Sequence, residues 1–185
     1  MNRCINDYLD RTFVIENAIT GANYLLQPIY RLEPCHGNLK QIAAICNEDL
    51  VYEWCFRSLC NGVPYPQTMA REWIQWGADG WQNSTHFVYV VTNSEKSIAA
   101  ALDIKSADLR RAEIGYWASA DHRGIMSNAV RAILPLADQA GFKLLFADIH
   151  PNNKRSQAVI RRCGFETVDR QPTISGHIPF ERPNR

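Results

Sequence analysis

Short apolar runs alternate with segments of helical periodicity from Leu25 onward, a pattern typical of an α/β or α+β fold. The runs are bounded by polar, glycine or proline residues, as β-strands are. They predict strands at residues 30–34, 86–92, 97–104, 113–117, 144–149, 165–168 and 174–180. The run at 144–149 is almost unbroken, which is expected of a strand buried on both faces of a sheet.

Apolar residues spaced three and four apart predict helices between these strands. The helices are expected at 36–48, from Pro66 onward, at about 125–140, and from Asn152 or Asn153 to Cys163. Gly141 follows the third helix as a C-terminal cap would, whereas Pro135 inside it predicts a kink or a helix in two pieces. This order of elements predicts an α+β (α/β-like) fold, with helices on both faces of a mixed, mostly antiparallel sheet.

The 185 residues are enough for one domain with a sizeable core. Residues 1–24 show no clear periodicity and are expected to form an N-terminal extension, followed by a single domain over 25–185. Charged residues such as Arg3 and Asp7 interrupt the N-terminus where a signal peptide would be apolar. No apolar run approaches the about 18–20 residues of a membrane span. We therefore expect a cytoplasmic protein with no membrane partner.

Charge balance and cysteine spacing argue against two further classes of function. The chain has 20 Lys and Arg against 19 Asp and Glu, so it lacks the positive field that a nucleic acid would need. Its six cysteines include no CxxC pair, and without an export signal they predict reduced thiols instead of a zinc site or disulfides. We expect neither a nucleic-acid partner nor a metal.

Three segments carry the candidate chemistry. They are AEIGYW (112–117), DHRGIMSNAV (121–130) and HPNNKRSQAVIRRCGFE (150–166). In the second segment, a turn at Gly124 leads into a helix whose first amides have no intrahelical partner, which favours a bound phosphate. Every turn between a strand and a helix ends in such free amides, so this feature alone is weak evidence for a phosphate site.

Together, the three segments resemble the GNAT superfamily of acetyl-CoA-dependent N-acetyltransferases, especially the ribosomal-protein (Rim-type) enzymes. The shared pattern is a strand like EIGYW, a glycine turn leading into IM-T/S-x-A, and P-x-N-x-x-S followed by GF. The resemblance implies acetyl-CoA as co-substrate and no metal. It also implies direct attack by a primary amine, either a protein N-terminal α-amine or the amine of a small molecule.

The resemblance also implies which residues bind the cofactor. Backbone groups of the strand would pair with the pantetheine arm, amides of the turn would hold the pyrophosphate, and one side chain would lie near the sulfur. The strand residues that would pair with the pantetheine arm are Tyr116, Trp117 and Ala118. The turn residues that would hold the pyrophosphate are Arg123, Gly124, Ile125, Met126 and Ser127, and the side chain near the sulfur is that of Asn153.

Two residues are the catalytic candidates that the resemblance implies. Ser156 would protonate the departing thiolate, and Glu113 would receive the proton of the amine, directly or through a water. Each also has a simpler interpretation. Glu113 could be a surface carboxylate or a partner of Arg110 or Arg111, and Ser156 could be an ordinary residue of a first helical turn.

The phosphate turn departs from the family pattern. Asp121 stands where a basic or amide residue belongs, and the loop is about two residues shorter than the usual form, which weakens an anion site. A compensating contact could come from Arg123, Lys154 or Arg155. The shortened turn is the feature that favours the alternative function, a catalytically degenerate GNAT domain that binds an acyl-CoA or a protein. A homodimer is also left open.

Overall fold

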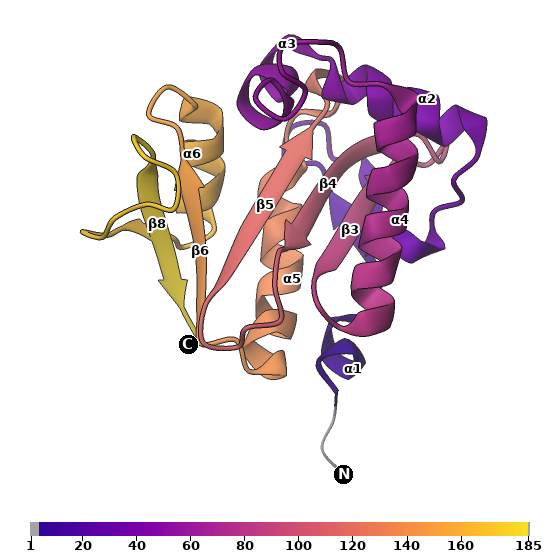
Figure 1. Cartoon of the computed structure of the whole chain (residues 1–185). Helices are drawn as coiled ribbons and strands as arrows, with labels where there is room; N and C mark the ends of the chain where they lie inside the picture. The colour runs from indigo at the N-terminus through magenta and orange to yellow at the C-terminus, as the bar shows by residue number, and fades with distance from the viewer. Residues whose placement is uncertain (1–3, 185) are drawn as a thin grey trace.

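The computed structural model describes residues 4–184, which form one sheet with helices packed against it (Figure 1). Within this range eight strands lie in the order β1-β2-β3-β4-β5-β6-β8-β7. Neighbouring strands are antiparallel except for the parallel pair β5–β6. The strands are β1 (Phe13–Glu16), β2 (Asn23–Pro28), β3 (Phe87–Thr92), β4 (Ile98–Ile104), β5 (Ala112–Ala118), β6 (Leu144–Ile149), β7 (Glu166–Thr167) and β8 (Ile178–Pro183).

Helices cover both faces of this mixed, mostly antiparallel sheet, which confirms the predicted fold class. Figure 1 shows α4 on one face and α5 on the other. The helices are α1 (Ile5–Leu9), α2 (His36–Cys46), α3 (Asp49–Val51), α4 (Gln67–Asn83), α5 (Met126–Ala140) and α6 (Lys154–Arg162). No helix in the described range is both long and apolar enough to cross a membrane.

Most predicted elements are present, one predicted strand was wrong, and one of the two outcomes predicted for Pro135 is excluded. Residues 30–34 are not a strand, because the chain forms a 3-10 turn (Ile29–Arg31) in which Ile29 and Leu32 are both buried. A helix in two pieces was predicted as one outcome of Pro135, but α5 is continuous across it. Pro135 and Arg131, whose carbonyl loses its helical partner there, are both exposed, so water can hydrate that carbonyl.

The segment predicted to be an N-terminal extension contributes elements to the sheet and its covering layer. Its described part contains α1, β1 and the start of β2, which crosses the predicted boundary at residue 24. Leu9 is fully buried, and the Tyr89 hydroxyl donates a hydrogen bond to the Leu9 carbonyl at 2.7 Å. These elements are too short to show a periodicity in the sequence. Residues 1–3 lie outside the described range.

Helix α4 approaches β3 so closely that only a glycine fits at the contact. A Cβ atom on Gly77 would lie 2.7 Å from Cγ2 of Ile29 and 3.1 Å from Cβ of Val88. Both neighbours are fully buried and cannot move aside.

Replacing Gly77 by alanine is therefore expected to lower the free energy of unfolding by about 1–3 kcal/mol, as overpacking does. Urea denaturation would measure it. Gly37→Ala in α2 is the matched control, since its Cβ would meet only Cys35 Sγ at 3.9 Å. There alanine is expected to be neutral or to stabilise by up to about 1 kcal/mol. Equal midpoints for wild type and Gly77→Ala would contradict this account of the contact.

Candidate active site

The central strands β5 and β6 separate along their length. They pair only at Ala112 with Leu145 and at Glu113 with Phe146. Beyond these pairs, β5 continues to pair with β4 and β6 with β8, so the two strands diverge toward their carboxyl ends (Figure 1). The edge of β5 that faces β6 therefore has no strand partner from residue 114 onward. Two cavities lie where the strands part.

The first cavity has a volume of about 590 Å³ and lies at the N-terminus of α5; we call it the α5 cavity. Most of the residues predicted to bind a cofactor line it: Tyr116, Trp117, Ala118, Arg123, Gly124, Met126 and Asn153. Ile125 and Ser127 do not line it with their side chains. Ile125 is fully buried in the core, and the Ser127 carbonyl lies 3.5 Å from Cys163 Sγ.

The turn before α5 presents a row of free amides. No hydrogen bond within residues 4–184 engages the backbone N–H groups of residues 123–127, and Ile125, the N-cap, supplies no side-chain cap. Four basic side chains also line this cavity: Arg123, Lys154, Arg155 and Arg162. Asp121 is exposed in a short 3-10 turn and is not part of the lining. The arrangement suits an anionic group, because free amides, the helix dipole and basic side chains converge.

The turn is held from behind by Asn17, which sequence reasoning missed. Asn17 is 1% exposed and lies in the loop between β1 and β2. Its Nδ2 donates to the Arg123 carbonyl at 2.8 Å, and its Oδ1 accepts from the amide of Ile19 at 2.9 Å. Gly124 has a φ of +103°, and a Cβ there would overlap Asn17 Oδ1. The N-terminal hairpin thus fixes the conformation of the turn before α5.

Asn153 and Ser156 stand together at the start of α6. Of the two residues at which this helix was predicted to begin, Asn153 is the N-cap, and its Oδ1 accepts from the Ser156 amide at 3.1 Å. Ser156 Oγ lies 2.8 Å from the Tyr116 hydroxyl, which also donates to the Ser156 carbonyl at 3.0 Å. Burial raises the pKa of Tyr116, so its hydroxyl stays protonated. The sequence suggested only a backbone role for Tyr116, because its pairing across 40 residues leaves no local signal.

A π-helical segment (Tyr52–Phe56) covers the place where the strands part. π-Helical turns are rare and are frequent at functional sites, and here the segment brings Trp54 and Cys55 to the cavity wall. Glu48 ties this cover to the end of β5 by accepting hydrogen bonds from Ser119 Oγ and the Ala120 amide, both at 2.6 Å. Cys55 is exposed to solvent, and desolvation by the surrounding chain raises the pKa of its thiol to about 11.

The second cavity, about 340 Å³, lies over β4 and β5; we call it the β4 cavity. Its floor includes Asp103, Lys105, Glu113 and Gly115, and aromatic rings form part of its wall. Among these rings, Trp54 and His150 lie with their centroids 4.8 Å apart. The two cavities share Trp54, Cys55, Tyr116, Trp117, Asn153 and Ser156. The Tyr116–Ser156 hydroxyl pair therefore lies at their junction.

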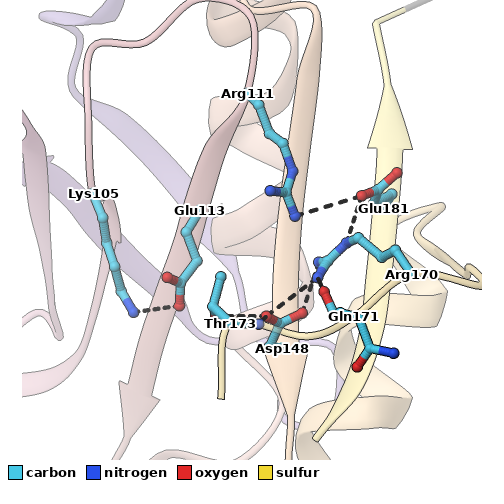
Figure 2. A network of polar contacts seen from close by, with 8 residues as sticks. All are labelled: Lys105, Arg111, Glu113, Asp148, Arg170, Gln171, Thr173 and Glu181. Carbon is cyan, nitrogen blue, oxygen red and sulfur yellow. Dashed lines mark hydrogen bonds and ion pairs between the residues drawn. The ribbon is translucent and has the colours of Figure 1, made fainter. Parts of the chain in front are cut away.

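Glu113 faces the β4 cavity and is half-buried. Its Oε1 accepts a hydrogen bond from Lys105 Nζ at 2.5 Å (Figure 2). The other partners considered for it are engaged elsewhere, since Arg110 pairs with Asp108 and Arg111 lies 3.7 Å from Glu181. The hydrogen bond with Glu113 and the charges of Glu113 and Asp103 raise the pKa of Lys105, although burial acts in the opposite direction.

A second polar network holds the segment 168–177, which we call the strap, against β6 and β8. Arg170 donates to Asp148 at 2.7 Å and to Glu181 at 2.6 Å, and Thr173 Oγ1 donates to Asp148 at 2.6 Å (Figure 2). The strap carries Ile174 and His177 into the lining of the β4 cavity. This network therefore shapes one wall of that cavity.

Asp148 is expected to make the stability of the strap depend on acid. Burial raises the pKa of Asp148, but the hydrogen bonds from Arg170 and Thr173 and the charge of Arg170 outweigh it, so the net pKa is lowered. A lowered pKa stabilises the fold above the unfolded value of about 4, and this contribution is lost as the pH falls through the folded value. Asp148→Asn should thus cost about 1–3 kcal/mol at neutral pH and clearly less near about pH 3. Urea denaturation at both pH values measures this, and a cost independent of pH would contradict it.

Comparison with known proteins identifies the family. The model of the acetyltransferase (GNAT) domain family matches residues 31–166. The chain belongs to the GNAT acetyltransferase family. This confirms the resemblance drawn from the sequence. Search of the curated proteins gives no match.

Solved structures share the fold at low sequence identity. RimJ from Mycobacterium smegmatis, in complex with CoA-disulfide, has a TM-score of 0.74 at 17% identity, covering 95% of this chain and 88% of its own. The ribosomal-protein-S5-alanine acetyltransferase from Vibrio fischeri has a TM-score of 0.69 at 16% identity, covering 95% of this chain and 97% of its own. The spermidine N-acetyltransferase from Vibrio cholerae, in complex with CoA and spermine, has a TM-score of 0.65 at 15% identity, covering 87% of this chain and 95% of its own.

Proposed function

We propose that this protein transfers an acetyl group from acetyl-CoA to a primary amine. The observation that carries the proposal is the meeting of two cavities at Tyr116 and Ser156. One cavity has the amides and basic side chains for a phosphorylated cofactor, and the other has carboxylates for a cationic amine. Family membership supports the same activity. Because acetyl-CoA is the co-substrate, the proposed place of action is the cytoplasm.

The cofactor is proposed to lie along the α5 cavity. Its pyrophosphate would accept hydrogen bonds from the free amides of residues 123–127, those of Ile125 and Ser127 included, with Arg123 and Lys154 beside it. Its pantetheine arm would lie against Tyr116, Trp117 and Ala118, since β5 has no strand partner on that edge. The thioester would then reach the junction beside Asn153.

The chemistry is direct attack, for which the chain's own groups suffice. The amine must lose a proton, and its nitrogen then forms a bond to the thioester carbon while the bond between carbon and sulfur breaks. The Ser156 hydroxyl is placed to give the departing thiolate its proton, and Tyr116 at 2.8 Å is placed to return one. Once the nitrogen is bonded to the carbonyl carbon it loses a second proton, and this proton returns to Tyr116, so that both hydroxyls end the reaction protonated. Because the two substrates are bound next to each other, the bimolecular reaction becomes effectively unimolecular. The scheme requires no metal.

The acceptor is proposed to be a protein N-terminal α-amine or a small amine. The β4 cavity holds two carboxylates and one ammonium group in its floor, so its charge favours a cation. The pKa of an α-amine is about 8 and that of a lysine side chain about 10.4, so a base removes the proton from an α-amine more easily. The similar solved structures include one acetyltransferase of each kind, one for ribosomal protein S5 and one for spermidine.

Release of free CoA thiol in the presence of acetyl-CoA and an amine would test this function. The amines are a short peptide with a free N-terminal alanine and, separately, spermidine, and mass spectrometry would identify the acetylated product. Product that depends on both substrates is expected. Binding of acetyl-CoA without transfer to either amine would support the alternative, a domain that binds and does not turn over. No feature of the described residues favours that alternative.

A further inference from the structure

Asp103 lies in the floor of the β4 cavity and was not among the residues suggested by the sequence. Asp103 on β4 lies opposite Gly115 on β5. Two residues further along the chain, Lys105 lies opposite Glu113, and its amide donates to the Glu113 carbonyl at 2.9 Å. Residues two apart on a strand share a face, so Asp103, Lys105 and Glu113 all point to the same side. On the same face, Trp117 follows at the junction of the two cavities.

The two carboxylates of this floor differ in their partners. Glu113 Oε1 accepts from the Lys105 ammonium at 2.5 Å, so its charge is already paired. Asp103 Oδ1 accepts only a neutral amide, that of Gly115 at 2.9 Å. No hydrogen bond or ion pair within residues 4–184 engages Asp103 Oδ2. Asp103 therefore has an oxygen free for a ligand in the cavity.

Gly115 is what allows Asp103 to lie across β5. A Cβ at this position would lie 2.7 Å from Asp103 Oδ1 and 2.8 Å from Lys105 Cε. Any larger residue would push both side chains away from the strand. The absent side chain thus leaves room for the carboxylate over β5, on the same face as Trp117, which lines both cavities.

We infer that Asp103 binds the ammonium form of the acceptor and takes the proton that the amine must lose before attack, while Glu113 holds Lys105 in place. This rests on the proposed function and deepens it. The proton moves from the ammonium nitrogen to an oxygen of Asp103, and the freed lone pair forms the bond to the acetyl carbon. Asp103 then releases the proton to solvent.

The charges around Asp103 suit this role. Burial raises the pKa of Asp103, and the Glu113 carboxylate adds to this, whereas Lys105, the Gly115 amide and His86 partly offset it. The Cys55 thiol faces the same group from the covering segment and is protonated. A carboxyl group with a raised pKa is a better match for an amine than an ordinary one, and proton transfer is most effective when the two are close.

The test is a pH–rate profile of kcat/KM for wild type, Asp103→Asn and Glu113→Gln, with the alanine peptide and with spermidine. Asp103→Asn is expected to lose about 100-fold near neutral pH. For the peptide, the loss should shrink above about pH 8, since its amine then arrives already deprotonated. Glu113→Gln is expected to lose less and to keep the wild-type profile. Asp108→Asn is the control, because Asp108 forms an exposed ion pair with Arg110; it should change neither kcat/KM nor the shape of its pH profile.

Calorimetric affinity for acetyl-CoA and thermal melting separate this inference from folding and from the cofactor site. The affinity for acetyl-CoA should be the same in Asp103→Asn and wild type, and the variant should melt no lower than wild type, because burial raises the pKa of Asp103 and its charge therefore costs stability at neutral pH. A wild-type profile in Asp103→Asn, or the larger loss in Glu113→Gln, would overturn the inference and leave the proposed function standing. A wild-type protein that transfers acetyl to neither amine would overturn both.

Discussion

Gly124→Ala is expected to raise the Kd for acetyl-CoA by about 10- to 100-fold, or about 1.4–2.8 kcal/mol of binding free energy. Gly124 has a φ of +103°, in a region that costs a residue with a side chain about 1–2 kcal/mol, and its new Cβ would overlap Asn17 Oδ1. The turn must shift, and the amides of residues 123–127 then no longer converge on one anion. Isothermal titration calorimetry would measure the change.

Gly62→Ala separates this effect from the general cost of a left-handed residue. Gly62 has a φ of +79°, nothing lies within 4 Å of its added Cβ, and it lines neither cavity. It should lose stability but keep its affinity for acetyl-CoA. Equal affinities for both variants would mean that the turn does not hold the cofactor.

Ser156→Ala is expected to lower kcat by about 100-fold, the scale of one positioned proton donor, and to leave the Kd for acetyl-CoA nearly unchanged. Tyr116→Phe should lower kcat in the same direction, since it removes the hydroxyl 2.8 Å from Ser156 Oγ. Because the two hydroxyls act as one unit, the double variant should be little worse than Ser156→Ala alone. Steady-state rates of thiol release would measure all three.

Tyr30→Phe is the matched control for the loss of a tyrosine hydroxyl. That hydroxyl bonds Asp10 at 2.7 Å and is outside both cavities. Its kcat should equal that of wild type. Wild-type kcat in Ser156→Ala would reduce Ser156 to a residue of the first helical turn, and additive losses in the double variant would contradict a shared role.

Local patterns predicted much of the sheet and its main helices. The strand at 144–149 and the helix ending at Gly141 match the structure because an apolar run and a left-handed glycine are signals within a few residues. The prediction failed at 30–34, where Ile29 and Leu32 are buried by a 3-10 turn instead of a strand. Side chains three apart lie on one face of a 3-10 turn but on opposite faces of a strand, and a segment this short shows no periodicity that would distinguish the two.

The parts of the site that could not be predicted depend on contacts between distant segments. Asn17 supports the turn at Arg123 from 106 residues away, and its own segment has no periodicity. The Tyr116–Ser156 pair and the position of Asp103 under Gly115 follow from how strands and helices meet in space. The sequence therefore predicted a weak phosphate turn, whereas in the structure this turn is held from behind by Asn17 and four basic side chains line the adjoining cavity.

Calorimetric titration of the wild-type protein with acetyl-CoA, and separately with CoA, tests the central claim most directly. If the α5 cavity is a cofactor site, both ligands should bind at one site per chain with micromolar Kd, and Gly124→Ala should weaken both. No binding of either ligand up to millimolar concentration would contradict the account, because the free amides and basic side chains would then hold no cofactor.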